Sequence, residues 1–259
     1  MIPPAAGERA VAGVDGCRGG WIVAIALPGK PPSVAVFPRF AALLDALPAD
    51  AVIAVDMPIG LPDHCFHGGR GPESLVRPLL GQRQSSVFSI PSRQAVYTAV
   101  VERETEQAWL DAHRAASAAS RLTSTPPRGV AIQAFGLFSK IREIDALLRG
   151  DLSLTGRIIE SHPELAFWRL SGRRPLLLPK KVKNRVHPPG MEERRALLVA
   201  NGFDPAFVRQ LPPRGAGEDD FLDALAVLTV ARRHAAGEAE RFPDPPLRDA
   251  YGLPIAIHV

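Results

Sequence analysis

The sequence has few cysteines and no long apolar run. Cys17 and Cys65 are too few for a disulfide framework and lack the spacing of a zinc finger. A reducing compartment is the simpler setting for them. No window is long and apolar enough to span a bilayer, and Met1 to Arg9 contains no apolar stretch typical of a signal peptide. The sequence therefore predicts a soluble, cytoplasmic protein with no membrane partner.

Internal repeats and low-complexity segments are also missing, which favours one ordinary globular core. Of the 259 residues, 46% are apolar and 22% are charged, as is typical of a globular protein. The formal charge of +4 suits a polyanionic partner such as nucleic acid without requiring one. We therefore expect a single domain over residues 1–259, which can also form a homo-oligomer.

The amino-terminal region contains a glycine-rich hairpin with an acidic residue. An apolar run from Val11 reaches Asp15, the glycine-rich stretch 16–20 turns the chain, and a second apolar run follows. This pattern predicts a strand, a tight turn and an antiparallel strand. Glycine permits positive φ and lets a ligand approach the backbone closely. Asp15 then either serves a bound metal or phosphate or only satisfies the amides of the turn.

The remaining pattern predicts an α/β fold. Residues 33–37 form a third β-rich run, residues 51–55 form a continuous apolar run before Asp56, and a fifth strand is predicted at 157–160. Helical periodicity marks the segments 39–47, 131–148 and 218–231. Helical crossovers would place the fourth and fifth strands parallel to the first. We therefore expect a mixed five-stranded sheet flanked by helices.

Three segments do not fit a simple alternation of strands and helices. Residues 59–128 are rich in glycine and proline and show no convincing strand, with a helix at 101–122, so they predict a largely helical insertion after the fourth strand. That insertion forms either a lid or substrate surface or a structural pair of helices. Residues 173–200 form a basic loop and helix segment. Residues 253–259 form an edge strand or pack on the surface.

Five carboxylates have positions that favour a shared site. Asp15, Asp56 and Glu160 end the three strands expected to be parallel, and ligands bind at that edge of an α/β sheet. Asp220 and Asp223 are three residues apart and share one face near the start of the last helix. Converging carboxylates repel unless a cation neutralises them, and oxygen ligands select Mg²⁺ or Mn²⁺ over zinc. Two such ions are the usual arrangement for phosphodiester cleavage.

Each carboxylate also has a structural interpretation. Acids in the first turn of a helix are stabilising by about 0.3–1 kcal/mol, which suffices for Asp219 and applies to Asp220 as well. Glu160 has the alternative of an ion pair with Arg157 or a lysine. His162 and Glu164 either orient a metal ligand or cap the turn after the fifth strand.

Basic residues provide candidate contacts to substrate phosphates. Lysines and arginines that contact phosphate position a nucleic acid and make binding depend on salt. The alternative for the basic segment is a solvated loop. The candidate substrate-binding residues come from the hairpin, the insertion and the basic segment, and are Arg18, Arg83, Arg93, Lys180 and Lys181.

An ordered set of motifs along nearly the whole chain resembles a known family. These motifs are Gly13-Val14-Asp15-Gly16-Cys17-Arg18-Gly19-Gly20-Trp21, Asp56-Met57-Pro58-Ile59-Gly60-Leu61-Pro62, Ser85-Ser86-Val87-Phe88 through Pro91-Ser92-Arg93, Lys140-Ile141-Arg142-Glu143-Ile144-Asp145, Glu160-Ser161-His162-Pro163-Glu164 with Phe167, Lys180-Lys181, and Asp219-Asp220 with Asp223-Ala224. Together they resemble the bacterial and archaeal family of unknown function described as predicted ribonuclease H-like nucleases.

The resemblance implies a ribonuclease H-like fold, whose sheet has the strand order 3-2-1-4-5, and metal-dependent nuclease activity. The Asp-x-x-Asp-Ala start of the last helix is similar to that of Holliday-junction resolvases, which implies metal-ligand roles for Asp15, Asp56 and Asp223, with Asp220 next. Glu73 stands where the family would have an aspartate, which weakens any role at that position.

The leading hypothesis is a Mg²⁺- or Mn²⁺-dependent hydrolase acting on RNA or structured DNA. The catalytic set would be Asp15, Asp56, Glu160, Asp220 and Asp223. One alternative is an ATP-binding phosphotransferase of the actin-like superfamily, where a similar hairpin cradles phosphate. The other is a non-catalytic protein that binds nucleic acid.

Overall fold

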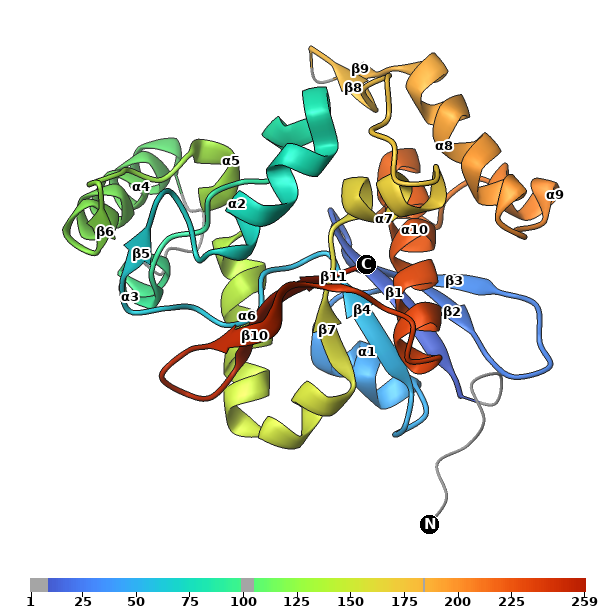
Figure 1. Ribbon diagram of the computed structural model, residues 1–259, viewed down its shortest axis with the longest axis horizontal. Helices are drawn as coiled ribbons and strands as arrows, with labels where there is room; N and C mark the ends of the chain where they lie inside the picture. Colours follow the sequence, from blue (N-terminus) through green and yellow to red (C-terminus); the bar gives the residue numbers. More distant parts are fainter. Residues whose placement is uncertain (1–8, 99–104, 184) are drawn as a thin grey trace.

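A five-stranded mixed sheet forms the centre of the computed structural model, which describes residues 9–98, 105–183 and 185–259 (Figure 1). The strand order is β3-β2-β1-β4-β7. β1, β2 and β3 are antiparallel neighbours, whereas β4 and β7 run parallel to β1. The predicted order and directions are therefore confirmed, with β7 in the fifth position. The strands are β1 Val11–Cys17, β2 Gly20–Ala26, β3 Ser33–Phe37, β4 Val52–Val55 and β7 Ile158–Glu160.

Helices cover both faces of this sheet and create two apolar cores. On one face, α10 (Glu218–Ala235) packs against alternate residues of the central strands, including Ala54. On the other face, α1 (Phe40–Ala46) and α6 (Phe138–Gly150) pack against the intervening residues, including Val14 and Val55. Successive side chains of a strand point to opposite faces, so an uninterrupted apolar run such as β4 supplies both cores.

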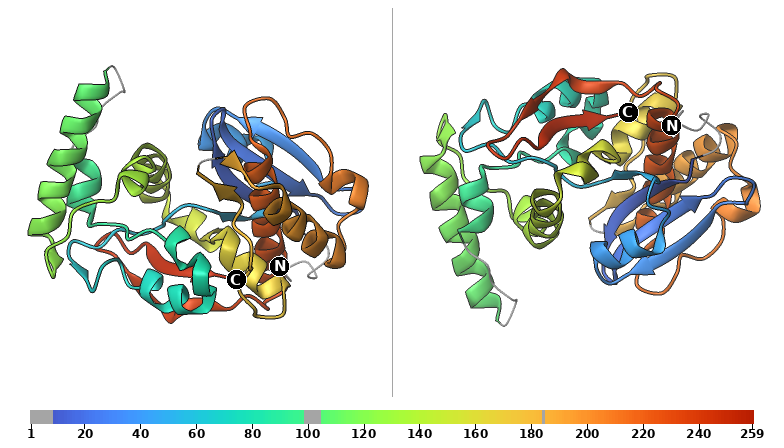
Figure 2. Two further views of the ribbon diagram at one scale, coloured as in Figure 1. Left: turned by 90° about the horizontal axis from the view of Figure 1, so that it is seen from above. Right: turned by 90° about the horizontal axis from the view of Figure 1, so that it is seen from below.

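The segment between β4 and α6 is mostly helical. In the views of Figure 2, α4 lies at the opposite end of the molecule from α8 and α9. The short strands β5 and β6, which the sequence pattern did not reveal, pair in parallel. Residues 101–104 of the helix predicted at 101–122 lie outside the described residues. The elements are β5 Cys65–Phe66, α2 Pro72–Val76, the 3-10 helix η1 Arg77–Ser86, α3 Arg93–Tyr97, α4 Glu106–Leu122, β6 Ser124–Thr125 and α5 Ile132–Phe135.

Two predictions for single segments need correction. The helix predicted at 131–148 is divided into α5 and α6, because the chain leaves the helix at Gly136 and Leu137. Residues 253–259 do not join the edge of the large sheet. They form β11, which pairs with β10 in a separate hairpin and contacts the end of β7 through a bridge between Ser161 and His258.

The remaining elements follow α6 and include the basic segment. A hairpin, β8–β9, precedes α8 and projects from the molecule in Figure 1. Within the described part of the chain, no helix has the length and apolar character needed to cross a bilayer. The elements are the 3-10 helix η2 Leu152–Gly156, α7 Pro163–Leu170, β8 Lys181–Val182, β9 Arg185–Val186, α8 Pro188–Ala200, α9 Pro205–Val208, β10 Arg241–Arg248 and β11 Pro254–His258.

Gly13 allows α10 to lie directly on β1. A β-carbon at this position would lie deep inside van der Waals contact with the backbone nitrogen of Leu228 and the backbone oxygen of Ala224. Because both obstacles are backbone atoms, no side-chain rotation would relieve the overlap. The packing distance between α10 and the central strand therefore depends on glycine at position 13.

The substitution Gly13→Ala is expected to destabilise the fold by at least the ~1–3 kcal/mol typical of overpacking, because α10 must move away from β1. Chemical denaturation would measure the loss. Gly150→Ala is the matched control, since a β-carbon there meets nothing within 4 Å and the residue ends a helix. Equal stabilities for the two variants would contradict this account.

Candidate active site

Asp15 and Asp56 lie side by side on one face of the sheet. In the parallel pairing of β1 and β4, Val14 is opposite Val55, and the amide of Asp56 donates to the carbonyl of Val14 at 2.8 Å. Asp15 and Asp56 follow that pair directly, so both side chains point to the face opposite the two valines. That is the face covered by α10, since Gly13, two residues before Asp15, contacts this helix.

Glu160 lies on the other face of the sheet, although it also ends a parallel strand. Glu160 is paired with Val55, not with Asp56. A difference of one residue in register reverses the direction of a side chain. The prediction that the three acids stand at the ends of parallel strands is confirmed, but register separates Glu160 from the pair Asp15 and Asp56.

The first turns of α10 bring further acids towards the pair. Asp223 is buried, with a side chain only 1% exposed, in agreement with its position among apolar residues in the sequence. Asp220 accepts a hydrogen bond from the amide of Gly217 at 2.8 Å and so caps the helix. Asp219 forms an ion pair with Lys181 at 2.5 Å. Asp223 is therefore the buried residue of α10 that extends the acidic group at the sheet edge, and Asp220 lies near enough to contribute to the raised pKa of Asp15.

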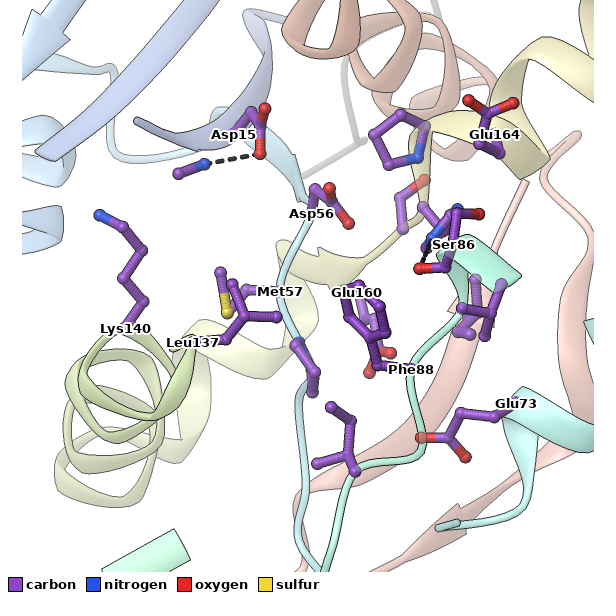
Figure 3. A pocket seen from close by; sticks show the side chains of 18 of the residues that line it. Asp15, Asp56, Met57, Glu73, Ser86, Phe88, Leu137, Lys140, Glu160 and Glu164 are labelled. Carbon is purple, nitrogen blue, oxygen red and sulfur yellow. Dashed lines mark hydrogen bonds between the residues drawn. The ribbon is translucent and has the colours of Figure 1, made fainter. Parts of the chain in front are cut away.

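A cavity of about 270 Å³ opens beside these acids. Figure 3 shows Asp15 and Asp56 at one end, Glu73 at the other, and the apolar side chains of Met57, Phe88 and Leu137 between them. The walls come from segments far apart in the sequence, including the chain after β4, the end of η1 and the starts of α6 and α7. The cavity thus has an acidic end at Asp15 and Asp56 and a middle that combines these apolar side chains with Glu160.

Burial and mutual repulsion disfavour the charged forms of the paired acids. The pKa of Asp56 is raised to about 7, mainly by burial and then by the nearby carboxylates of Asp223 and Glu164, against the lowering effect of Lys180. Burial also raises the pKa of Asp15 well above its ordinary value, with Asp56 and Asp223 contributing. Perturbed carboxylates in a cavity are typical of functional sites. Without an added cation, this group of acids is electrostatically strained.

Lys180 supplies a positive charge to the group. Its ammonium forms an ion pair with Asp223. Burial alone would lower the pKa of Lys180, but the carboxylates of Asp223 and Asp15 outweigh it and raise that pKa. Lys180 and Lys181, predicted as contacts for substrate phosphate, both have carboxylate partners on α10 in this structure.

Glu160 belongs to a buried network with Arg70. Its Oε1 atom accepts from Arg70 at 2.6 Å, and its Oε2 atom accepts from Arg70 at 3.0 Å and from the amide of Ile59 at 2.7 Å. Glu73 pairs with the same guanidinium at 2.8 Å. The alternative of an ion pair is therefore realised with Arg70, not with Arg157. Both oxygens of Glu160 are engaged, so its role as a metal ligand stays a prediction that would require the network to rearrange.

Glu164 and His162, at the start of α7, also line the cavity. Glu164 pairs through one oxygen with the fully buried Arg194, while its Oε2 atom has no hydrogen-bond partner among the described residues. The same holds for the Oδ1 atom of Asp223. Buried polar atoms are normally satisfied, so these two oxygens fit ligands of a bound cation or solvent.

The chemistry of this donor set fits Mg²⁺ or Mn²⁺, which prefer carboxylate oxygens. Asp15, Asp56 and Asp223 are the residues that would hold the ion, and Glu164 is positioned to join them. Their side chains do not enclose an ion as they stand: in the described ranges, no three His, Cys, Asp or Glu residues form a ready metal-binding group. Lys180 pairs with one of the candidate ligands in this arrangement.

The three predicted substrate-binding arginines do not line the cavity. Arg18 is exposed in the turn between β1 and β2, and Arg83 is half-buried in η1. Arg93 is buried and forms ion pairs with Asp145 and, at 2.6 Å, with Asp249. Arg93 therefore joins α3, α6 and the carboxy-terminal region, a structural role that sequence spacing did not reveal.

Sequence reasoning missed several residues that shape the site. Arg70 gave no signal apart from its glycine-rich surroundings, yet it holds Glu160. Lys140 lies over the ring of Trp21, 4.3 Å from its centroid, and donates to the carbonyl of Gly20 at 2.5 Å. Its motif was noted in the sequence, but its contact with the opening hairpin depends on tertiary structure.

The substitution Asp56→Asn is expected to raise the stability of the metal-free protein above pH 7, by up to about 4 kcal/mol. The folded-state pKa of Asp56 is raised, so its ionisation costs stability as pH increases from about 4 to about 7. The two proteins should converge below pH 4 and diverge above it in melting curves recorded with EDTA. Asp45→Asn, on the exposed side of α1, should change nothing. A difference independent of pH would contradict this origin.

The substitution Glu160→Gln is expected to destabilise the protein by about 3–5 kcal/mol, because Arg70 loses one of its two buried charge partners. Denaturation with and without Mg²⁺ would measure this loss, which should be the same in both. Glu106→Gln, exposed at the start of α4, is the control. Full metal-free stability with a loss of stabilisation by Mg²⁺ would instead indicate a metal ligand.

Comparison with known proteins supplies a family but no function. Neither a curated protein nor a solved structure matches the chain significantly. Residues 13–248 match a family described as "Protein of unknown function (DUF429)". This match begins inside β1 and includes the other four strands of the large sheet and α10. The chain therefore belongs to this family of proteins of unknown function.

Proposed function

We propose that the protein is a divalent-metal-dependent hydrolase that cleaves phosphodiester bonds of RNA or structured DNA, on a ribonuclease H-like fold. The sheet order and strand directions are those expected of that fold. The observation that carries the proposal is the convergence of Asp15, Asp56 and Asp223 beside a cavity that Asp15 and Asp56 line. These acids repel one another, and the free Oδ1 atom of Asp223 adds to the need for a cation.

A bound Mg²⁺ or Mn²⁺ would activate the attacking water and stabilise the leaving oxygen. The role of the chain is to hold the three acids that would bind the ion and to fix their orientation. The adjacent strands fix Asp15 and Asp56 through backbone pairing, and the amide of Gly16 donates to Asp15 at 2.7 Å. α10 fixes Asp223 against them. The apolar walls of the cavity limit the access of bulk water.

Lys180 and the β8–β9 hairpin would contact the substrate phosphates. Lys180 lines the cavity, and the hairpin begins at the next residue. Lys183 and Arg185 are exposed on this hairpin. When a cation neutralises Asp223, the ammonium of Lys180 loses its partner and becomes available to a phosphate. The hairpin would then continue the positive surface away from the cavity, which makes binding depend on salt.

The wild-type protein is expected to cleave labelled single-stranded or structured nucleic acids in the presence of Mg²⁺ or Mn²⁺. Asp15→Asn and Asp56→Asn should each lower the rate by more than about 100-fold, because a metal ion contributes several kcal/mol to such a reaction. Gel analysis of products from a panel of substrates would measure the rates.

Asp45→Asn provides the matched control, since it makes the same chemical change at an exposed position. It should retain the full wild-type rate. Equal cleavage by wild type, Asp15→Asn and Asp56→Asn would identify a contaminating nuclease and refute the proposal. Salt-sensitive binding without turnover by the wild type would instead favour a non-catalytic nucleic-acid-binding protein.

A further inference from the structure

The middle of the cavity has a chemistry that the acidic end does not explain. Met57 and Leu137 contribute aliphatic walls, and the half-buried Phe88 contributes an aromatic ring. Figure 3 shows Phe88 below Asp56 in the view and Met57 and Leu137 below it and to the left. Phosphates and metal ions form no favourable contacts with such walls. A flat apolar group would be stabilised by the aromatic ring, on which it can stack, and by the aliphatic side chains, which exclude water from it.

His162 adds a polar group with a defined preference to the cavity wall. Its Nε2 atom lies 3.3 Å from the carbonyl of Ser86, which can only accept, so the proton of the neutral ring is on Nε2. The Nδ1 atom then carries a lone pair. It is buried without a hydrogen-bond partner among the described residues. Protein atoms cover this nitrogen in this structure, so it would accept from an N–H group of a ligand only after the cavity wall rearranges.

The size of the cavity restricts what can occupy it. A volume of about 270 Å³ lies at the small end of ligand sites and suits one ring system with its sugar, not a stacked helix. The carboxylates occupy one end, so a phosphate held there leaves the apolar middle to the group next to it. In a nucleic acid, the group attached to the same sugar–phosphate unit is a base.

We infer that the cavity binds one unpaired nucleobase next to the bond that is cleaved, so that the substrate is a single strand or a locally opened strand and not a continuous duplex. This inference rests on the proposed function and specifies its substrate class. Phe88 would stack on the base, Met57 and Leu137 would enclose it, and His162 would accept from its edge. Removing a base from a stack is least costly where the strand is already unpaired.

The test compares three labelled oligonucleotides of one sequence in the presence of Mn²⁺. One is single-stranded, one carries an abasic site at the nucleotide next to the mapped cleavage position, and one is annealed to its complement. Wild type should prefer the first. Phe88→Ala should lower cleavage of that strand by about 5- to 150-fold, as for the loss of base stacking, with little effect on the abasic strand.

Two further variants separate stacking from folding. Phe88→Leu keeps an apolar side chain and should show an intermediate loss. Phe66→Ala removes a phenylalanine that is 60% exposed in β5, outside the cavity, and should behave like wild type. The ratio of rates on the normal and abasic strands is compared within each variant. A reduced fraction of folded protein therefore leaves that ratio unchanged.

A binding measurement makes the two proposals separable. The fluorescence of a single strand containing 2-aminopurine should change on binding to Asp15→Asn, and less so on binding to Asp15→Asn with Phe88→Ala. If this fluorescence change occurs and the wild type cleaves no substrate, the nuclease proposal is refuted and the base-binding site is supported. Cleavage of normal, abasic and duplex strands at equal rates, unaffected by Phe88→Ala, keeps the nuclease and overturns the base site. If neither cleavage nor the fluorescence change is observed, both proposals are overturned.

Discussion

The contact between Gly13 of β1 and the backbone of α10 is the constraint on which the site depends. Only a residue without a β-carbon lets the helix approach the strand this closely. The helix enters over the sheet edge, and Asp223, near its start, thereby comes close to Asp15 and Asp56. If α10 lay farther from β1, Asp223 would be separated from Asp15 and Asp56, and the three acids would not form a shared site.

The charge balance of the site follows from this packing. Burial places several carboxylates close together, and Lys180 compensates them in part through its pair with Asp223. The arrangement costs stability in the metal-free protein, as is common where function needs a strained group of charges. Glu160 differs, because Arg70 and the amide of Ile59 engage both of its oxygens and offset part of the burial that raises its pKa. The acids therefore divide into a strained group and a satisfied one.

The cavity places an apolar binding surface next to this strained group of acids. Its acidic end suits a cation and a phosphate, and its apolar middle, with Phe88 and the acceptor of His162, suits a base. Segments separated by more than 100 residues contribute to it, and the most distant of its walls is near the carboxy terminus at Ile257. Membership of a family of unknown function assigns no activity. The argument for an activity therefore depends on the acids and the apolar region of the cavity taken together.

The amino-acid sequence by itself determined the α/β architecture, the strand directions, and the positions of Asp15 and Asp56 near strand ends and of Asp223 near the start of the last helix, because hydrophobic periodicity and strand ends are local properties. The convergence of these three acids depends on the packing of α10 on β1. Register, which sends Glu160 to the other face of the sheet, depends on pairing between strands and is not visible in one strand. The ion pairs of Lys180 and Arg93 could not be predicted from the sequence either, since each partner lies more than 40 residues away along the chain. Only the tertiary structure decided them, because contacts of that kind arise from packing and not from spacing along the chain.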